Sequence, residues 1–149
     1  MLVQLTDWDA TQRLGAGLAK ALGAEDRVFL RGDLGSGKTA LAGAILRAFG
    51  YGGLVKSPTY TLVEEYDLGF LRVVHADLYR LTAPEDLETL GWWDYLDGRT
   101  LTLVEWPERS GDLLRADVDV WLTVTDDGRQ AQLRALSPRG VGVLEALKS

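Results

Sequence analysis

Residues 30–39 read LRGDLGSGKT, and the glycines, lysine and threonine of this stretch separate two apolar segments. The preceding segment, VFL (28–30), predicts a short buried strand. The following segment predicts a helix from about Lys38 to Phe49, which Gly50 ends. Because glycine allows tight turns and has no side chain, we expect the backbone between the two elements to wrap closely around a ligand.

The glycine stretch matches the phosphate-binding loop pattern G-x-x-x-x-G-K-[ST] at Gly32, Gly37, Lys38 and Thr39. Backbone amides of such a loop point at phosphate oxygens, and the helix that follows adds the positive end of its dipole. Lys38 is placed to reach the β- and γ-phosphates, and the Thr39 hydroxyl to bind Mg²⁺. The predicted phosphate-binding residues are Asp33, Leu34, Gly35, Ser36, Gly37, Lys38, Thr39 and Ala40.

The alternative is a glycine-rich turn without function. At an average glycine usage of ~7%, the four fixed positions coincide by chance in well under ~1% of chains of this size. The strand before the stretch and the helix after it are also the context that the motif requires. The sequence therefore favours phosphate binding.

Composition limits the other kinds of site. The chain has 149 residues, which predicts a single phosphate-loop ATPase domain over 1–149. Hydrophobic residues make up 46% and charged residues 26%, as in ordinary globular proteins. There is no cysteine and one histidine, which excludes disulfides, thiolate zinc sites and multi-histidine metal sites.

Charge and hydropathy bear on partners and location. The net charge is −6, and the 16 Lys and Arg residues are scattered without forming a run. We therefore expect little direct nucleic-acid binding by the chain alone, because that binding needs a basic face. The first residues, MLVQLTDWDATQRLG, do not resemble a signal peptide, and no apolar run approaches the roughly 20 residues that span a bilayer. We expect a cytoplasmic protein without membrane contact.

The rest of the pattern predicts both helices and strands. Capping boxes with Thr6 and Thr82 as N-caps predict helices that reach Gly23 and Leu90 respectively. The alternation of apolar residues and the turn residues between the runs predict an antiparallel hairpin around DLGF, a buried strand, and a second hairpin near the C-terminus. The predicted strands are 62–66, 71–77, 100–105, 118–125 and 130–136. This mixture predicts an α/β fold, a P-loop NTPase-like three-layer sandwich with a mixed, partly antiparallel central sheet.

A magnesium ion beside a phosphate loop also needs an acidic partner, usually at the end of a neighbouring buried strand. Glu105 ends the strand LTLV (101–104), and Asp77 ends LRVVHA (71–76). Either could be an ordinary solvated charge, but the loop in the same small domain favours a role at the site. The residues alone leave open which of the two carboxylates binds the metal and which one orients or deprotonates the attacking water.

GTPases and small-molecule kinases are two other classes of phosphate-loop protein to which the chain could belong. A GTPase needs an Asn-Lys-x-Asp motif to read guanine, and the chain contains no asparagine, so ATP is favoured. A small-molecule kinase usually has an arginine-bearing lid. Arg109 and Arg115 could serve such a lid, but ordinary surface arginines explain them as well.

Three further motifs resemble those of the TsaE (YjeE) family, the ATPase component of bacterial tRNA threonylcarbamoyladenosine (t6A) synthesis. They are SPTYTLVEEY (57–66), HADLYRL (75–81) and LVEWPER (103–109), in the order and spacing of that family. The resemblance runs from about residue 28 to residue 125. Ala76 and the pair Trp92-Trp93 depart from the family's usual residues, away from the phosphate chemistry.

The resemblance assigns roles to the residues of these motifs, with ATP and Mg²⁺ as cofactors. It implies that Lys38, Asp77 and Glu105 are catalytic, Asp77 being the aspartate needed for hydrolysis. Thr39 and Glu105 are the implied metal-associated residues. The other implied nucleotide-site residues are Thr59 and Thr61 in a switch loop, Trp106 beside the nucleotide, and Thr11 at the adenine.

The resemblance also implies a function and partners. It predicts an ATPase that supports threonylcarbamoyl transfer to adenosine 37 of tRNA as a partner of the TsaD and TsaB proteins. No arginine is evidently placed as a finger, so we expect slow turnover alone and stimulation by the partners. The alternative is a non-hydrolytic interaction module in which bound ATP only orders the loop at 57–61.

Overall fold

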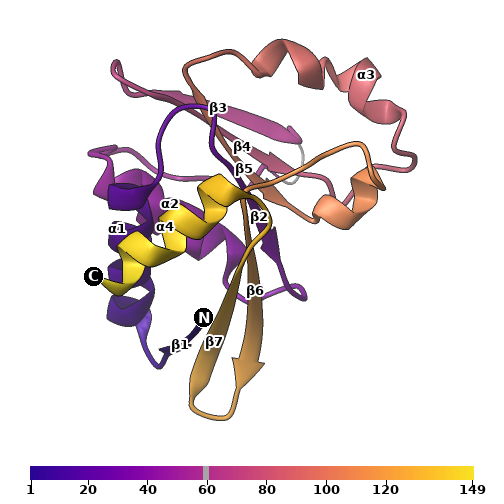
Figure 1. The fold of residues 1–149 in the computed structure, drawn as a ribbon. Coiled ribbons are helices and arrows are strands. Elements are labelled where there is room, and N and C mark those ends of the chain that lie inside the picture. Colours follow the sequence, from indigo (N-terminus) through magenta and orange to yellow (C-terminus); the bar gives the residue numbers. More distant parts are fainter. Residues whose placement is uncertain (59–60) are drawn as a thin grey trace.

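A computed structural model describes residues 1–58 and 61–149, and Figure 1 shows its fold. One seven-stranded sheet runs through it, with the strand order β1-β7-β6-β2-β5-β4-β3. The strands are β1 (Leu2–Leu5), β2 (Arg27–Arg31), β3 (Val63–Asp67), β4 (Arg72–Asp77), β5 (Thr100–Glu105), β6 (Val118–Thr125) and β7 (Gly128–Ala135). The helices are α1 (Trp8–Ala21), α2 (Lys38–Ala48), α3 (Asp86–Leu90) and α4 (Pro138–Lys148), with 3₁₀ helices η1 (Trp92–Tyr95) and η2 (Pro107–Ser110).

The sheet is mixed, as the sequence predicted. Four central strands, β6, β2, β5 and β4, run parallel to one another. Strand β3 pairs antiparallel with β4 at one edge, and β7 and β1 extend the other edge in antiparallel pairs. Both expected hairpins are therefore confirmed. The carboxyl ends of the buried parallel strands all lie at the same end of the sheet, where ligands bind in sheets of this kind.

Two hydrophobic cores lie on the two faces of the sheet. On one face, Leu18 of α1 and Ile45 of α2 pack with Leu30 and Leu103 from the strands. On the other face, Phe29, Val74 and Val104 pack with Leu87 of α3 and Trp92 of η1. Figure 1 shows α1, α2 and α4 together on one side of the strands and α3 on the other. The expected three-layer arrangement is confirmed.

Both predicted capping boxes were wrong in detail. Asp7, rather than Thr6, caps α1, and its Oδ1 accepts a hydrogen bond from the Ala10 amide at 2.8 Å. At α3 the Asp86 carboxylate reaches back and accepts from both the Thr82 hydroxyl and the Ala83 amide. Because one carboxylate satisfies two donors there, the helix begins at Asp86 rather than at the predicted cap.

One strand and one α-helix were not predicted, nor were the two short 3₁₀ helices. Strand β1 is a short edge strand that pairs with β7, and Leu5 is its one fully buried residue. Helix α4 packs on the α1 face of the sheet through Val143, and Gly140 lies close to the carbonyl of Asp117. In the described parts of the chain, the search for a helix both long and apolar enough to cross a bilayer found none.

Helices α1 and α2 approach each other at a glycine. A Cβ at Gly15 would lie 2.8 Å from the Ala44 carbonyl carbon and 2.9 Å from the Ile45 amide nitrogen, both backbone atoms. We predict that Gly15→Ala lowers the free energy of unfolding by about 1–3 kcal/mol, because the helices must separate. Urea denaturation measures this change. Gly142→Ala on α4, where a Cβ meets nothing within 4 Å, is the control, with a gain of up to about 1 kcal/mol. Equal effects of the two variants would contradict the proposed close approach.

Candidate nucleotide site

The phosphate-loop stretch lies between the end of β2 and the start of α2. Gly32, Gly35 and Gly37 all have positive φ angles, of 145°, 78° and 106°. A Cβ at Gly32 would lie 2.5 Å from the Leu122 carbonyl oxygen, so both its conformation and its surroundings require glycine. The loop therefore has the tight curvature that the sequence predicted.

The concave side of the loop presents unpaired donors. Among the described residues, no acceptor is found for the amides of Gly37, Lys38 and Thr39 at the start of α2. The Ser36 hydroxyl is buried there and likewise has no described partner. Free amides at a helix N-terminus are suited to an anion, and buried polar groups without partners are rare. The loop thus fits a phosphate group.

The Lys38 side chain is folded into the loop. Its Nζ donates to the carbonyl oxygens of Gly32 at 2.6 Å and Asp33 at 2.9 Å. It also lies 4.5 Å from the centre of the Trp106 ring, as in a cation–π contact. Burial lowers the pKa of Lys38, while Glu105 and other nearby carboxylates act in the opposite direction. The ammonium is therefore held at the loop by several weak partners rather than by one ion pair.

Glu105, the last residue of β5, joins the loop to the sheet. Its Oε2 accepts from the Thr39 hydroxyl at 3.0 Å, and its Oε1 lies 3.3 Å from the same hydroxyl. The Nε2 atom of His75 lies 2.5 Å from Oε2. Because Glu105 and His75 are both buried, these contacts fix the carboxylate beside Thr39. The two predicted metal-associated side chains are thus in contact.

Asp77, the last residue of β4, lies opposite Glu105 in the register of the parallel pair. Its Oδ1 accepts from the Tyr79 amide at 3.0 Å, and the side chain is buried. Burial raises the pKa of Asp77, and the Glu105 charge raises it further, while the Tyr79 amide, His75 and Lys38 oppose the shift. A carboxylate with a raised pKa is a better proton acceptor than an ordinary aspartate.

A cavity of about 300 Å³ brings these groups together. It is lined by the residues of the loop and by the ends of the two strands: Leu34, Gly35, Gly37, Lys38, Thr39, Ala40, Ser57, Asp77, Glu105 and Trp106. Most of the predicted site residues therefore share one cavity. Asp33 instead lines a neighbouring hollow with Ser36 and Trp106.

A second cavity of about 210 Å³ lies on the other side of the loop. Thr11 of α1 lines it together with Ser36, Gly37 and Ala40. The loop thus has a phosphate-sized space on one side and an adjoining space beside Thr11, where the resemblance expects the adenine. Trp106 lies on the opposite side, over Lys38.

Two described residues of the segment 57–61 differ in their relation to the cavity. Ser57 lines the cavity. The Thr61 hydroxyl donates to Glu64 at 3.0 Å, and Thr61 does not line the cavity. Thr59 lies outside the described residues.

Two contributors were missed at the sequence level. His75 precedes Asp77 by two residues, and the alternation of a strand places both on one face, so the pattern contained this signal. Arg129 of β7 lines the cavity beside Thr11 and donates to the Gly35 carbonyl at 3.0 Å. No local signal could have identified Arg129, because it lies 94 residues from Gly35 in the chain.

The donor set suits magnesium bound together with phosphate. The described residues contain no group of three or more His, Asp or Glu side chains that could hold a metal ion alone. Mg²⁺ usually takes one or two carboxylates and completes its shell with water and substrate phosphates. Thr39 and Glu105, beside a loop that fits phosphate, match that pattern.

The chain resembles the members of a known protein family. The family model described as "Threonylcarbamoyl adenosine biosynthesis protein TsaE" matches residues 5–134. The chain belongs to the TsaE family. The region matched is longer than the resemblance that the sequence motifs suggested, since it includes α1 and most of β7.

Curated members of the TsaE family align with most of the chain. The tRNA threonylcarbamoyladenosine biosynthesis protein TsaE of Haemophilus influenzae is 44% identical over 123 residues, covering 82% of this chain and 78% of that protein. The Rickettsia felis protein of the same name is 37% identical over 128 residues, covering 85% and 74%. Among solved structures, Bacillus subtilis YdiB has the same fold, with a TM-score of 0.82 and 24% identity over 99% of this chain and 93% of that one.

The buried Asp77 carboxylate predicts that the stability of this TsaE-family chain depends on pH. The folded-state pKa of Asp77 is raised from 3.8, so its ionisation disfavours folding as the pH rises from the ordinary value through the raised one. Asp77→Asn should therefore increase the Tm of the nucleotide-free protein near pH 8 and have little effect below about pH 4. Thermal unfolding across this range measures the difference.

Asp112→Asn is the control, because Asp112 is exposed and should give no pH-dependent change. An Asp77→Asn protein that is less stable than the wild type near pH 8 would show that the carboxylate is favourably paired, contrary to the geometry described above.

Proposed function

We propose that this chain is a Mg²⁺-dependent ATPase that supports threonylcarbamoyl transfer to adenosine 37 of tRNA as a partner of the TsaD and TsaB proteins. Membership of the TsaE family supports the role in tRNA modification. The observation that supports ATP hydrolysis is the meeting of Lys38, Thr39, Glu105 and Asp77 around one cavity beside a phosphate loop. Turnover is slow in the isolated chain and increases in the partner complex.

The roles of the residues follow from their positions. The free amides of the loop and the Lys38 ammonium hold the β- and γ-phosphates of the substrate. Thr39 and Glu105 are the residues that would hold Mg²⁺, with His75 fixing the orientation of the carboxylate. When bound, the metal supplies charge neutralisation on the phosphoryl oxygens.

Asp77 handles the attacking water. It lines the same cavity as Lys38 and Glu105, and its Oδ1 accepts from the Tyr79 amide, which leaves Oδ2 to accept a hydrogen bond from water. Its raised pKa makes it a suitable base or orienting group. Of the two carboxylates, Glu105 is the better candidate for the metal ligand, because the Thr39 hydroxyl and His75 hold it in place.

One component of phosphoryl transfer is not supplied by the cavity. No arginine is among the described residues that line it, and Arg129 nearby is bonded to the Gly35 carbonyl. An arginine supplied in trans accelerates such reactions on the order of 10³–10⁵-fold. We therefore assign the missing group to a partner protein, which accounts for the slow turnover of the chain alone.

Separate substitutions distinguish binding from hydrolysis. We predict that Lys38→Ala weakens Mg²⁺–ATP binding at least tenfold, because a phosphate partner is lost, whereas Asp77→Ala retains near wild-type affinity and loses hydrolysis. Calorimetric titration measures the affinity, and phosphate release measures turnover. Lys20→Ala and Asp112→Ala, both at exposed positions, are the controls.

Hydrolysis that survives in Asp77→Ala would mean that another group handles the water. Absence of hydrolysis in the wild type under all conditions would instead favour an ATP-gated interaction module, in which the nucleotide only orders the chain for docking.

Partner stimulation has its own test. We predict that adding purified TsaD and TsaB increases the steady-state ATPase rate by at least tenfold over the chain alone. The rate is measured by coupled ADP release at saturating ATP, with the Asp77→Ala chain in the same complex as the background. Equal rates with and without the partners would contradict the assignment of a missing group to them.

A further inference from the structure

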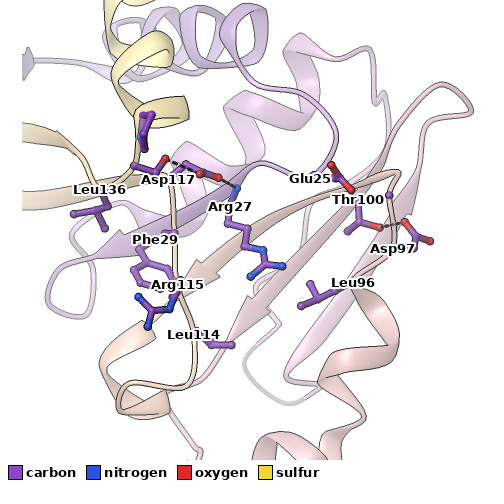
Figure 2. Close-up of a pocket in the computed structure, with 14 residues that line it drawn as sticks. Glu25, Arg27, Phe29, Leu96, Asp97, Thr100, Leu114, Arg115, Asp117 and Leu136 are labelled. Atoms are coloured by element: carbon purple, nitrogen blue, oxygen red, sulfur yellow. Dashed lines mark hydrogen bonds between the residues drawn. The ribbon is translucent and has the colours of Figure 1, made fainter.

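A cavity of about 810 Å³ lies at the opposite end of the sheet from the nucleotide site. Figure 2 shows its lining, which comes from the start of β2, the loop before β5 and the segment leading into β6. It shares no lining residue with either of the two cavities that adjoin the phosphate loop. Nothing in the proposed reaction uses this cavity.

Two arginines face the cavity. Arg27 is half-buried at the start of β2, and in Figure 2 its side chain extends into the space between Phe29 and Leu96. The Arg115 side chain lies beside Phe29 in the same view. Neither guanidinium group has a hydrogen bond or ion pair to another residue in the described parts of the chain. Guanidinium groups that have no partner are suited to binding an anion.

Three carboxylates also line the cavity, and two of them accept hydrogen bonds from other residues. Asp117 accepts from the Arg27 backbone amide at 2.9 Å and from the Ser137 hydroxyl at 2.7 Å. Asp97 accepts from Arg72, from the Thr100 hydroxyl and from the Arg99 amide. The Glu25 carboxylate lies toward the Thr100 end of the cavity, away from Arg115. The Arg115 guanidinium, beside Phe29, therefore lies apart from Glu25, while Asp117 keeps its charge because both of its donors are neutral.

A narrow inner extension of about 10 Å³ provides an independent observation. It shares Arg27, Phe29 and Arg115 with the main cavity and is also lined by Trp92. Trp92 is 2% exposed, yet its indole Nε1 has no hydrogen-bond partner among the described residues. An indole N–H can only donate, and buried donors are seldom left unpaired. The lining thus supplies three side chains, two guanidinium groups and one indole, whose donors have no partner among the described residues.

Much of the remaining lining is apolar. Phe29, Leu96, Leu114 and Leu136 form much of the wall. A volume of this order is typical of small-molecule sites, in which apolar walls surround a few polar groups that fix orientation. The ligand chemistry that matches this wall is an anionic head attached to an apolar body.

We propose that this cavity is a second ligand site that binds a small organic anion, a carboxylate or a phosphate monoester with an apolar body. Arg27 and Arg115 bind the anionic head, and the Trp92 N–H donates to one of its oxygens. The apolar body lies against Phe29 and the leucines. Binding here does not depend on the phosphate loop.

Titration with phenyl phosphate and benzoate tests the site. The chain contains five tryptophans, so the part of the emission change that is lost in Trp92→Phe reports binding near Trp92, and amide shifts in two-dimensional NMR locate the site. We expect saturable shifts at residues lining the cavity and an affinity that is at least tenfold lower in Arg27→Gln and in Arg115→Gln. Trp92→Phe should bind more weakly and lose the part of the emission change that comes from Trp92, because the removed N–H no longer donates to the anion.

The controls separate this site from the nucleotide site. Arg13→Gln, an exposed arginine on α1, should bind both anions as the wild type does, and neutral benzyl alcohol should not saturate. Lys38→Ala should keep the saturable shifts at the residues that line this cavity, whatever it changes at the phosphate loop. The tighter of the two anions identifies the head group. Absence of saturable shifts for both anions, unchanged affinity in both arginine variants, or loss of binding in Lys38→Ala would overturn the proposal. Arg115 is exposed, so its variant remains informative if Trp92→Phe fails to fold.

Discussion

The candidate site depends on the parallel pairing of β5 with β2 on one side and with β4 on the other. This register places Leu30, Glu105 and Asp77 in line at the carboxyl ends of three adjacent strands. All six residues of β5 are buried, so the strand is fixed from both faces. A shift of one residue would turn Glu105 to the opposite face and away from Thr39. The chemistry of the site is thus set by backbone hydrogen bonding before any side chain is considered.

The same arrangement places charge in a poorly solvated region. Lys38, His75, Asp77 and Glu105 are all buried within a short distance of the loop. Their contacts satisfy most of their hydrogen-bonding groups, but burial still shifts the pKa of Lys38 downward and that of Asp77 upward. Trp106, which follows Glu105, has a φ of 56°, a rare conformation for a large residue. Strain and perturbed pKa values of this kind concentrate at functional sites.

The sequence predicted those parts of the fold that are governed by local pattern. The phosphate loop, the central strands and the two hairpins each have a signal within a few residues of the chain. Strand β1 has no such signal, because one buried residue, Leu5, and pairing with the distant β7 define it. Caps were mispredicted where a neighbouring carboxylate, Asp7, was the better acceptor. The contact of Arg129 with the loop depends on tertiary structure alone.

The most direct test of the account is how far Mg²⁺ strengthens ATP binding, because Thr39 and Glu105 are assigned to hold the metal against the phosphates. Calorimetric titration of ATP with and without Mg²⁺, on the wild type and on Glu105→Gln, measures this enhancement. We expect the wild type to bind ATP at least tenfold more tightly with the metal, and Glu105→Gln to lose most of that gain while keeping its metal-free affinity. An unchanged enhancement in Glu105→Gln would contradict the assignment.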